Sequence, residues 1–340
     1  MNRHAAITGW GHAVPTTVVG NTFFESQVET TDEWIVERTG IRERRIAEPE
    51  ETTAGLASAA ADAILRRAGV AAASLDLIVI ATATPEQTVP QTAAFVADAL
   101  GVHCGALDLG AGCAGFVYGL VVGASAIAGG TFERVLVVGA ETLSRIVDPA
   151  DRATAILFGD AAAGVLLEAS EGPGLLTGDL GVDGSAAGIL EVPAGGSRRP
   201  ASAETVAGRE HFVRMQGQEV FRRAVRAVVD SSEIALGRAG VASSDVDWFV
   251  PHQANLRIIE AARQRLDIPP ERTVVNIERY GNTSAASIPL ALSEAAEAGR
   301  FADGDTLLLS RFGAGMSWAS AVLTWGRPDR KSTRLNSSHR

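Results

Sequence analysis

The strongest constraint on the fold of this chain is an internal repeat with an offset of 171 residues, about half of its 340 residues. Residues 68–79, Ala-Gly-Val-Ala-Ala-Ala-Ser-Leu-Asp-Leu-Ile-Val, resemble residues 239–250, Ala-Gly-Val-Ala-Ser-Ser-Asp-Val-Asp-Trp-Phe-Val. At the same offset the apolar run 135–138 falls on 306–309, and Cys113 falls on Ser284. Ordered matches at one offset indicate two copies of one structural unit. We therefore expect two related halves, residues 1–171 and 172–326.

Within each half, helical and strand patterns alternate. Residues 54–68 and 116–128 are rich in small residues and predict helices, whereas 75–81 and 134–138 are short apolar runs that predict buried strands. Residues 104–109 look like a poor strand. Such alternation predicts an α/β fold with helices covering the sheets. A duplicated α/β protein commonly has its site where the copies meet, so we look for chemistry there.

The composition excludes several classes of protein. With 46% hydrophobic and 21% charged residues, the bulk of the chain is not disordered. Two cysteines exclude a disulfide scaffold and indicate a reducing compartment. The net charge of −10 argues against nucleic acid as a partner. No signal-like or membrane-spanning run is found, so we expect a cytoplasmic protein with no membrane partner.

The end of the chain differs in character from the rest. Residues 331–340, Lys-Ser-Thr-Arg-Leu-Asn-Ser-Ser-His-Arg, are polar and follow a natural stop near Trp325. They resemble an assembly or cloning scar, and we exclude them from the fold. We expect residues 327–340 to form a disordered tail.

Cys113 is the first candidate for chemistry. It lies among small residues in Leu-Gly-Ala-Gly-Cys-Ala-Gly-Phe, residues 109–116, directly before a predicted helix. A helix N-terminus carries a partial positive charge, which stabilises a thiolate. Small neighbours leave room for a substrate at the sulfur. The alternative is an inert, buried cysteine of the core.

The same turn also matches Gly-x-Gly-x-x-Gly, a pattern typical of dinucleotide-binding turns. That function requires a clear strand before the turn and an acidic residue about 20 positions later. Because residues 104–109 make a poor strand and Glu141 comes late, we disfavour a dinucleotide site. The chain also lacks histidines spaced with cysteines or carboxylates as a zinc site requires, so we predict no metal.

Three segments in the second half carry further polar groups. His252 follows an apolar strand that Pro251 ends, and a residue at such a strand end faces a crevice in many α/β folds. Asn282 lies in the repeat counterpart of the Cys113 turn, where it could also be a simple helix cap. The turn at residues 312–316, Phe-Gly-Ala-Gly-Met, could offer backbone N–H groups to an oxyanion.

Together these segments resemble the β-ketoacyl-acyl carrier protein synthase III family. The resemblance rests on Ala-Gly-Cys-Ala-Gly-Phe at 111–116, Val-Pro-His-Gln-Ala-Asn-Leu-Arg at 250–257, Gly-Asn-Thr-Ser-Ala-Ala at 281–286 and Phe-Gly-Ala-Gly at 312–315. Residues 31–44, Thr-Asp-Glu-Trp-Ile-Val-Glu-Arg-Thr-Gly-Ile-Arg-Glu-Arg, add a fifth motif. The resemblance implies a thiolase-like fold, in which a duplicated α/β unit forms five αβαβα layers. That expectation agrees with the repeat.

The resemblance implies a decarboxylative Claisen condensation that starts fatty-acid synthesis. Cys113 would take the acyl group of an acyl-CoA primer. His252 and Asn282 would then stabilise the enolate formed from malonyl-acyl carrier protein as carbon dioxide leaves. The backbone N–H groups of Cys113 and Ala314 would form the oxyanion hole, although the family often has glycine at the position of Ala314. No cofactor is expected, since the coenzyme A thioester is a substrate.

The resemblance also implies contacts with coenzyme A. Trp34 would stack on the adenine, with Arg152 on the other face of the base and Arg38 near the phosphates. Ala153 follows where family members often have glycine. A tunnel for the pantetheine arm would be lined by Phe221, Ala254 and Asn255, and Thr30 is added to the predicted binding residues.

Two further expectations concern partners. Arg222, Arg257 and Arg265 are predicted to dock the acidic carrier protein, within a set of second-half arginines that also includes Arg223, Arg226 and Arg263. The alternative is an ordinary charged helix face. The resemblance also implies a homodimer, in which Val89 would line the acyl pocket, partly of the other subunit. Because Val89 is smaller than the phenylalanine of acetyl-preferring relatives, we expect room for a branched or longer primer.

Other functions stay open at this stage. A starter enzyme of polyketide or other secondary metabolism would keep Cys113, His252 and Asn282. A simple acyl transfer to an alcohol or amine would not need the histidine and asparagine pair. A 3-hydroxy-3-methylglutaryl-CoA synthase is disfavoured, because no acidic residue lies in the short motif around Cys113. A carrier-binding protein without activity is disfavoured by the complete triad.

Overall fold

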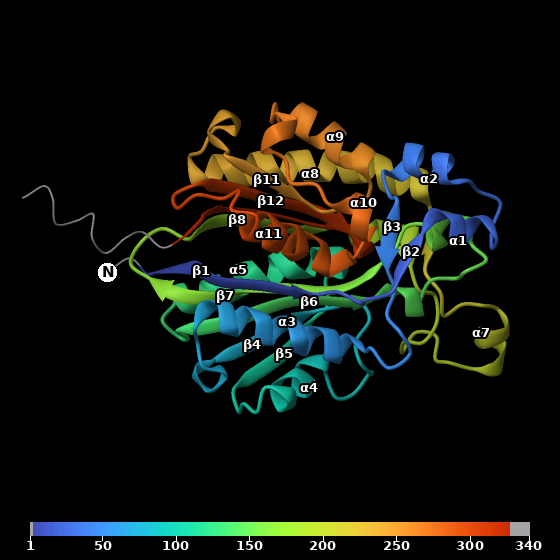
Figure 1. The fold of residues 1–340 in the computed structure, drawn as a ribbon, viewed down its shortest axis with the longest axis horizontal. Coiled ribbons are helices and arrows are strands. Elements are labelled where there is room, and N and C mark those ends of the chain that lie inside the picture. The colour runs from blue at the N-terminus through green and yellow to red at the C-terminus, as the bar shows by residue number, and fades with distance from the viewer. Residues whose placement is uncertain (1–2, 327–340) are drawn as a thin grey trace, which may run out of the picture.

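The structure is a computed structural model, and residues 3–326 are described. The predicted disordered tail at 327–340 lies outside the described residues. Within residues 3–326, two mixed β-sheets are stacked with a helical layer between them and a helical layer outside each (Figure 1). The arrangement is therefore the five-layer αβαβα fold that the sequence predicted.

The first sheet uses strands from residues 4–170. Its order is β1-β7-β6-β4-β5. β4 runs parallel to β5 and β6, whereas β7 runs antiparallel to β6 and β1. The strands are β1 (His4–Ala13), β4 (Leu77–Ala81), β5 (Gly105–Leu109), β6 (Arg134–Thr142) and β7 (Asp160–Ser170).

The second sheet repeats this topology with one strand fewer. Its order is β11-β12-β13-β8, with β11 and β12 parallel and the other pairs antiparallel. β11 thus corresponds to β4, β12 to β6, β13 to β7 and β8 to β1. The strands are β8 (Leu175–Val182), β11 (Trp248–Pro251), β12 (Thr306–Gly313) and β13 (Ser317–Thr324).

Helices α5 (Gly115–Ala128) and α11 (Ser287–Glu297) form the middle layer. The largest apolar cluster joins them to both sheets. α3 (Thr53–Ala68) and α4 (Thr92–Ala99) cover the outer face of the first sheet, and α8 (Gly217–Ala239) and α9 (Leu256–Arg265) cover that of the second (Figure 1). A Cβ on Gly119 would lie 3.0 Å from Val137, so glycine lets α5 approach β6 closely.

The repeat is visible in how equivalent elements end. α3 is capped by Gly69 and α8 by Gly240, both in the left-handed conformation with φ of 65° and 66°. Glycine adopts this conformation without the steric cost that other residues meet. These capping glycines are 171 residues apart, the offset of the sequence repeat. The duplication therefore extends to the details of the helix caps.

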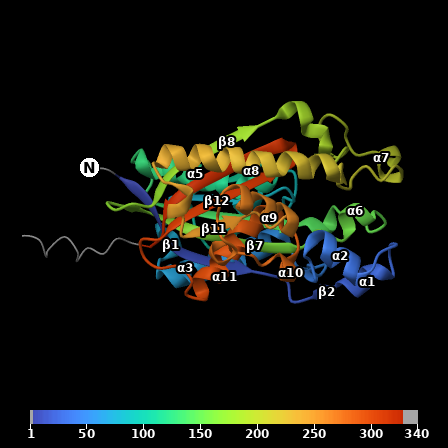
Figure 2. The same ribbon diagram turned by 90° about the horizontal axis from the view of Figure 1, so that it is seen from above.

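Smaller elements extend beyond one end of the two sheets (Figure 2). The short strands are β2 (Val18–Gly20), β3 (Glu43–Arg45), β9 (Leu190–Glu191) and β10 (Arg214–Met215). The short helices are α1 (Asn21–Glu25), α2 (Asp32–Thr39), α6 (Arg152–Ala155), α7 (Ala203–Ala207) and α10 (Ile277–Tyr280). Single turns of 3₁₀ helix are η1 (Ala72–Ser74), η2 (Gly112–Ala114), η3 (Leu143–Arg145), η5 (Ser243–Asp245), η6 (Pro270–Arg272), η7 (Ser284–Ala286) and η8 (Ala314–Met316), and η4 (Gly184–Ile189) is longer.

Most of the predicted elements are confirmed, and one prediction is wrong. The helices expected at 54–68 and 116–128 are α3 and α5, and the strands expected at 75–81 and 134–138 are β4 and β6. Residues 105–109, which looked like a poor strand, form the edge strand β5. The charged Asp108 interrupts the apolar pattern expected of a strand. Its carboxylate accepts hydrogen bonds from the backbone N–H groups of Thr92 and Ala93 and so caps α4.

Candidate active site

Cys113 lies in η2, directly before α5, and is only 7% exposed. Two glycines let the chain pack here. Gly112 has φ of +49°, and a Cβ on Gly313 of β12 would lie 2.6 Å from Cys113 Cβ. The end of a strand of the second half therefore touches the thiol-bearing turn of the first half. Cys113 therefore lies at the N-terminal end of α5, which carries a partial positive charge.

His252 follows directly after β11 and is buried. Its Nδ1 lies 2.5 Å from Ser287 Oγ, at the start of α11. Burial, and then the positive charge of Arg311, hold the pKa of His252 well below its usual value of 6.5. The imidazole is therefore neutral at pH 7. When the Ser287 hydroxyl donates to Nδ1, the ring N–H of the neutral imidazole is at Nε2.

Asn282 follows α10 and precedes η7. Its backbone is held against the first half, since its N–H donates to Leu157 O at 2.8 Å and its carbonyl accepts from Gly159 N at 3.1 Å. The side-chain Oδ1 accepts from Ser284 N at 3.0 Å. The Nδ2 amide group, the only donor of this side chain, can donate to a substrate.

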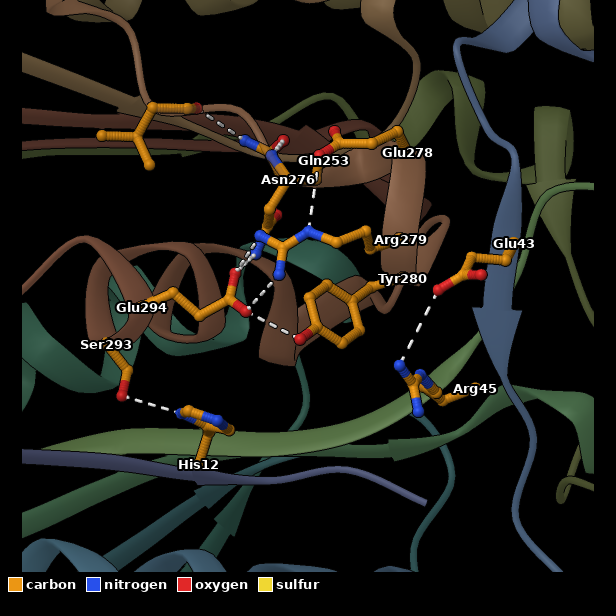
Figure 3. A network of polar contacts seen from close by, with 11 residues as sticks. His12, Glu43, Arg45, Gln253, Asn276, Glu278, Arg279, Tyr280, Ser293 and Glu294 are labelled. Atoms are coloured by element: carbon orange, nitrogen blue, oxygen red, sulfur yellow. Dashed lines mark hydrogen bonds and ion pairs between the residues drawn. The ribbon is translucent and has the colours of Figure 1, made fainter. Parts of the chain in front are cut away.

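A polar network joins α10, α11 and the segment after β11 (Figure 3). Glu294 of α11 accepts hydrogen bonds from Asn276, Arg279 and the Tyr280 hydroxyl, at 2.7–2.9 Å. Burial, and then Glu294, raise the pKa of Tyr280 to about 12. Gln253, next to His252, accepts from Asn276 N at 3.0 Å. The network thus ties the Asn282 and His252 segments to one helix.

One apolar cavity reaches all three side chains. Cys113, His252 and Asn282 line it together, although they come from three separated segments. Phe221 of α8, together with Ala254 and Asn255 at the start of α9, line the same cavity. The predicted pantetheine-contact residues therefore lie along the cavity that contains the triad.

Ala314 lies beside Cys113. A Cβ on Gly112 would lie 3.3 Å from Ala314 N, and a Cβ on Gly313 would lie 2.9 Å from Cys113 N. The two backbone N–H groups predicted to bind an oxyanion are therefore close neighbours.

The packing around Cys113 also disfavours a dinucleotide site. Although a strand does precede Cys113, segments of the second half occupy the space at the N-terminus of α5, where a pyrophosphate would bind.

Two arginine side chains lie against the ring of Trp34 in α2. The guanidinium carbon of Arg152 is 5.0 Å from the Trp34 ring centre, and that of Arg38 is 5.4 Å away. Arg38 was expected near phosphates but lies against the ring in this structure. Thr30 lies just before α2, and its buried hydroxyl oxygen has no hydrogen-bond partner. Asn255 Nδ2 donates to Arg38 O at 3.0 Å, which links α2 to the cavity.

Comparison with known proteins places this chain in a family. Residues 107–184 match the family model described as 3-oxoacyl-[acyl-carrier-protein] synthase III, and residues 236–325 match the model of its C-terminal part. A β-ketoacyl-[acyl-carrier-protein] synthase III of Symbiobacterium thermophilum is 50% identical over 96% of this chain and 99% of its own length. The chain belongs to the β-ketoacyl-acyl carrier protein synthase III family. It is a condensing acyltransferase of fatty-acid biosynthesis, as its resemblance implied.

Solved structures of synthase III proteins agree with this assignment. The Aquifex aeolicus enzyme is 41% identical, with a TM-score of 0.88 over 94% of this chain and 100% of the solved chain. A second structure, titled the priming β-ketosynthase from the R1128 polyketide biosynthetic pathway, is 37% identical with a TM-score of 0.90 over 96% of this chain and 98% of its own. The thiolase-like fold is thereby confirmed.

The three predicted docking arginines of this synthase III differ in their surroundings. Arg222 is exposed but donates hydrogen bonds to Glu219. Hydrogen bonds from Arg222 and Arg223 lower the pKa of Glu219 to about 2. Arg257 lies near the cavity, 5.8 Å from the Phe221 ring centre. Arg265 is exposed in the last turn of α9. Arg257 and Arg265 thus belong to one helix, whereas Arg222 on α8 is paired with an acid.

Val89 does not line the cavity of this chain. It is 80% exposed, in the loop before α4. The predicted role of Val89 in an acyl pocket requires a second subunit, so this role stays a prediction.

Sequence reasoning missed four polar residues that surround the triad of this synthase III. They are Glu141, Ser284, Ser287 and Arg311. Only the repeat carried a signal for one of them, because it pairs Ser284 with Cys113. No cluster of three or more histidine, cysteine or carboxylate groups within residues 3–326 could hold a metal ion. Over the same range, every helix is too short or too polar to span a bilayer.

Proposed function

We propose that this enzyme condenses an acyl-CoA primer with malonyl-acyl carrier protein through an acyl-Cys113 intermediate. The observation that carries the proposal is the meeting of Cys113, His252 and Asn282 in one apolar cavity. In the first half-reaction the Cys113 thiolate attacks the thioester carbonyl and coenzyme A leaves as its thiolate. The backbone N–H groups of Cys113 and Ala314 would bind the oxyanion that develops.

The second half-reaction uses the other two side chains. His252 Nε2–H and Asn282 Nδ2–H donate to the malonyl thioester oxygen, so they stabilise the enolate as the carboxylate leaves as carbon dioxide. The enolate carbon then attacks the carbonyl of acyl-Cys113 and releases the Cys113 thiolate. A neutral His252 suits this role, because it can donate from Nε2 without carrying a charge into the apolar cavity.

We propose that coenzyme A enters along α2 and α9. Trp34 would stack with the adenine, Arg152 would move from its present place over the ring to the other face of the base, and Arg38 would turn toward the phosphates. The pantetheine arm would pass Phe221, Ala254 and Asn255, with Thr30 near the entrance. Arg257 and Arg265 would guide the acidic carrier protein to the same entrance, with Arg222 beside them.

Three finer features belong to the same proposal. We infer a cytoplasmic homodimer, with two halves per chain bounded at residues 171 and 172. The Val89 loop would complete the acyl pocket of the opposite subunit, which would admit a branched or longer primer. No cofactor is required by the proposed chemistry.

A starter role in secondary metabolism is the second candidate. Its support is the solved priming β-ketosynthase of a polyketide pathway, which matches this chain over 96% of its length. Both functions use the same triad, so the preferred primer and carrier protein distinguish them.

The decisive experiment is the mass of the intact protein after incubation with a panel of acyl-CoAs. An adduct of the acyl mass is expected on the wild type and not on Cys113→Ser. His252→Ala should still be acylated but should no longer decarboxylate malonyl-acyl carrier protein. Condensation by His252→Ala at the wild-type rate would show that the assigned role is wrong.

A further inference from the structure

Arg311 is a fully buried guanidinium beside the nucleophile. It lies in β12, two residues before Gly313, which packs on Cys113, and its exposed fraction is 0%. One nitrogen, Nη2, donates to Ser284 O at 3.1 Å. Nε and Nη1 have no hydrogen-bond acceptor of good geometry. A buried cation with unmet donors is costly unless an anion lies next to it.

Two groups near Arg311 can carry a negative charge. One is Cys113, to which the Ser284 hydroxyl also donates at 3.3 Å. The other is Glu141 at the end of β6, which is fully buried. Burial lowers the pKa of Arg311 to about 10, and attraction to Cys113 and then to Glu141 opposes that change. Arg311, Glu141, Cys113 and the neutral His252 are the titratable groups that meet at this point.

Glu141 is already occupied by other partners. It accepts hydrogen bonds from Thr84 Oγ1 at 2.7 Å, Ala83 N at 3.1 Å and Ala285 N at 3.3 Å. Burial raises its pKa despite these donors. Its carboxylate joins β6 to η7 through neutral donors, so the buried guanidinium of Arg311 faces two acidic groups, the Glu141 carboxyl and the Cys113 thiol.

We propose that Arg311 stabilises the thiolate form of Cys113 before acylation. This inference rests on the proposed role of Cys113 as the nucleophile. The guanidinium would balance the charge of the thiolate as it forms, and Ser284 donates a hydrogen bond to the same sulfur. When the sulfur forms its bond to the acyl carbon, coenzyme A departs with the electron pair. Arg311 neither gains nor loses a proton in this step.

The test measures the alkylation of Cys113 by iodoacetamide between pH 5 and 9.5, in a Cys104→Ser background. In Arg311→Met we expect the pH of half-maximal alkylation to rise by about one unit or more, because a nearby opposite charge shifts such equilibria by about 1–3 units. Arg311→Lys should stay close to the parent. At the highest pH the rates of parent and Arg311→Met should converge, which a misplaced Cys113 would not allow.

A matched control is Arg44→Met. Arg44 is equally buried, but its guanidinium bonds Asn21 and Ile156 O and faces the Phe24 ring. Its loss should leave the alkylation profile unchanged. Thiolate absorbance near 240 nm, read against Cys113→Ser, should follow the same order. Should Arg311→Met not fold, Arg311→Gln removes the charge and serves in its place.

The outcomes separate this inference from the proposed function. If Arg311→Met, or Arg311→Gln in its place, has the alkylation profile of the parent, the inference is overturned while acylation of Cys113 by acyl-CoA still stands. If acyl-CoA labels Cys113→Ser as well as the wild type, the proposed function itself fails.

Discussion

The Ser284 hydroxyl donates a hydrogen bond to Cys113 Sγ across 3.3 Å, and the two residues are 171 positions apart. They are therefore equivalent residues of the two halves, and they meet where η2 and η7 face each other. Duplication has brought the same turn to the site twice. One copy carries the nucleophile, and the other carries a hydroxyl that bonds to it.

This contact makes Ser284 a useful residue to change. Ser284 has φ of +45°, a left-handed conformation that costs a non-glycine residue about 1–2 kcal/mol. Both Ser284→Ala and Ser284→Gly remove the hydroxyl. In both variants the rate of Cys113 acylation at pH 7 should therefore be lower than in the wild type by about fivefold or more. Only Ser284→Gly relieves the backbone, so it should be more stable than Ser284→Ala by about 1 kcal/mol in urea unfolding. Equal stabilities, or an unchanged acylation rate, would contradict this account.

The triad could be predicted from the sequence because each member lies in a short local motif. Cys113 precedes an apolar helix, His252 follows an apolar strand, and Asn282 lies in the repeat counterpart of the Cys113 turn. Local patterns of this kind can be recognised without knowledge of the fold. The repeat then indicated that the two halves would meet.

Arg311 and Glu141 could not be found in this way. Arg311 follows five residues of β12 and looks like the solvent-facing end of an apolar strand, yet it is fully buried and contacts η7. Glu141 looked only like the late acid of a dinucleotide site. Charged side chains become buried through packing between segments that are far apart in the sequence. Neither local spacing nor composition indicates such burial. The strand at 105–109 was missed for a similar reason, since Asp108 caps α4 instead of marking a loop.

Close contact at Gly313 predicts a site-specific loss of activity. Its φ of −161° suits any residue, so only space limits the position. In Gly313→Ala the new methyl group would press on Cys113 Cβ, and acylation should fall at least tenfold while the fold is kept. Gly237→Ala is the matched control, because nothing lies within 4 Å of its Cβ on the exposed face of α8. That variant should keep full activity and gain about 0.5–1 kcal/mol of stability.

Trp34 predicts a division between binding and chemistry. Stacking of a base on an aromatic ring contributes about 1–3 kcal/mol. Trp34→Ala should therefore raise KM for the acyl-CoA about tenfold with little change in kcat. The control is the matching acyl-pantetheine thioester, which lacks adenine and should show the same KM with both enzymes. An equal rise in KM for both substrates would place the role of Trp34 in the fold instead.

The buried neutral state of His252 predicts how stability depends on pH. Its pKa in the folded enzyme is well below 6.5, so below pH 6.5 the unfolded chain binds a proton that the folded chain does not. The contribution of His252 to the free energy of unfolding is complete above pH 6.5. It falls as the pH drops below 6.5, by up to about 1.4 kcal/mol per pH unit. His252→Gln should flatten the decline in urea midpoints between pH 6.5 and 5 relative to the wild type. Parallel declines in the two proteins would show that His252 is not held neutral in the fold.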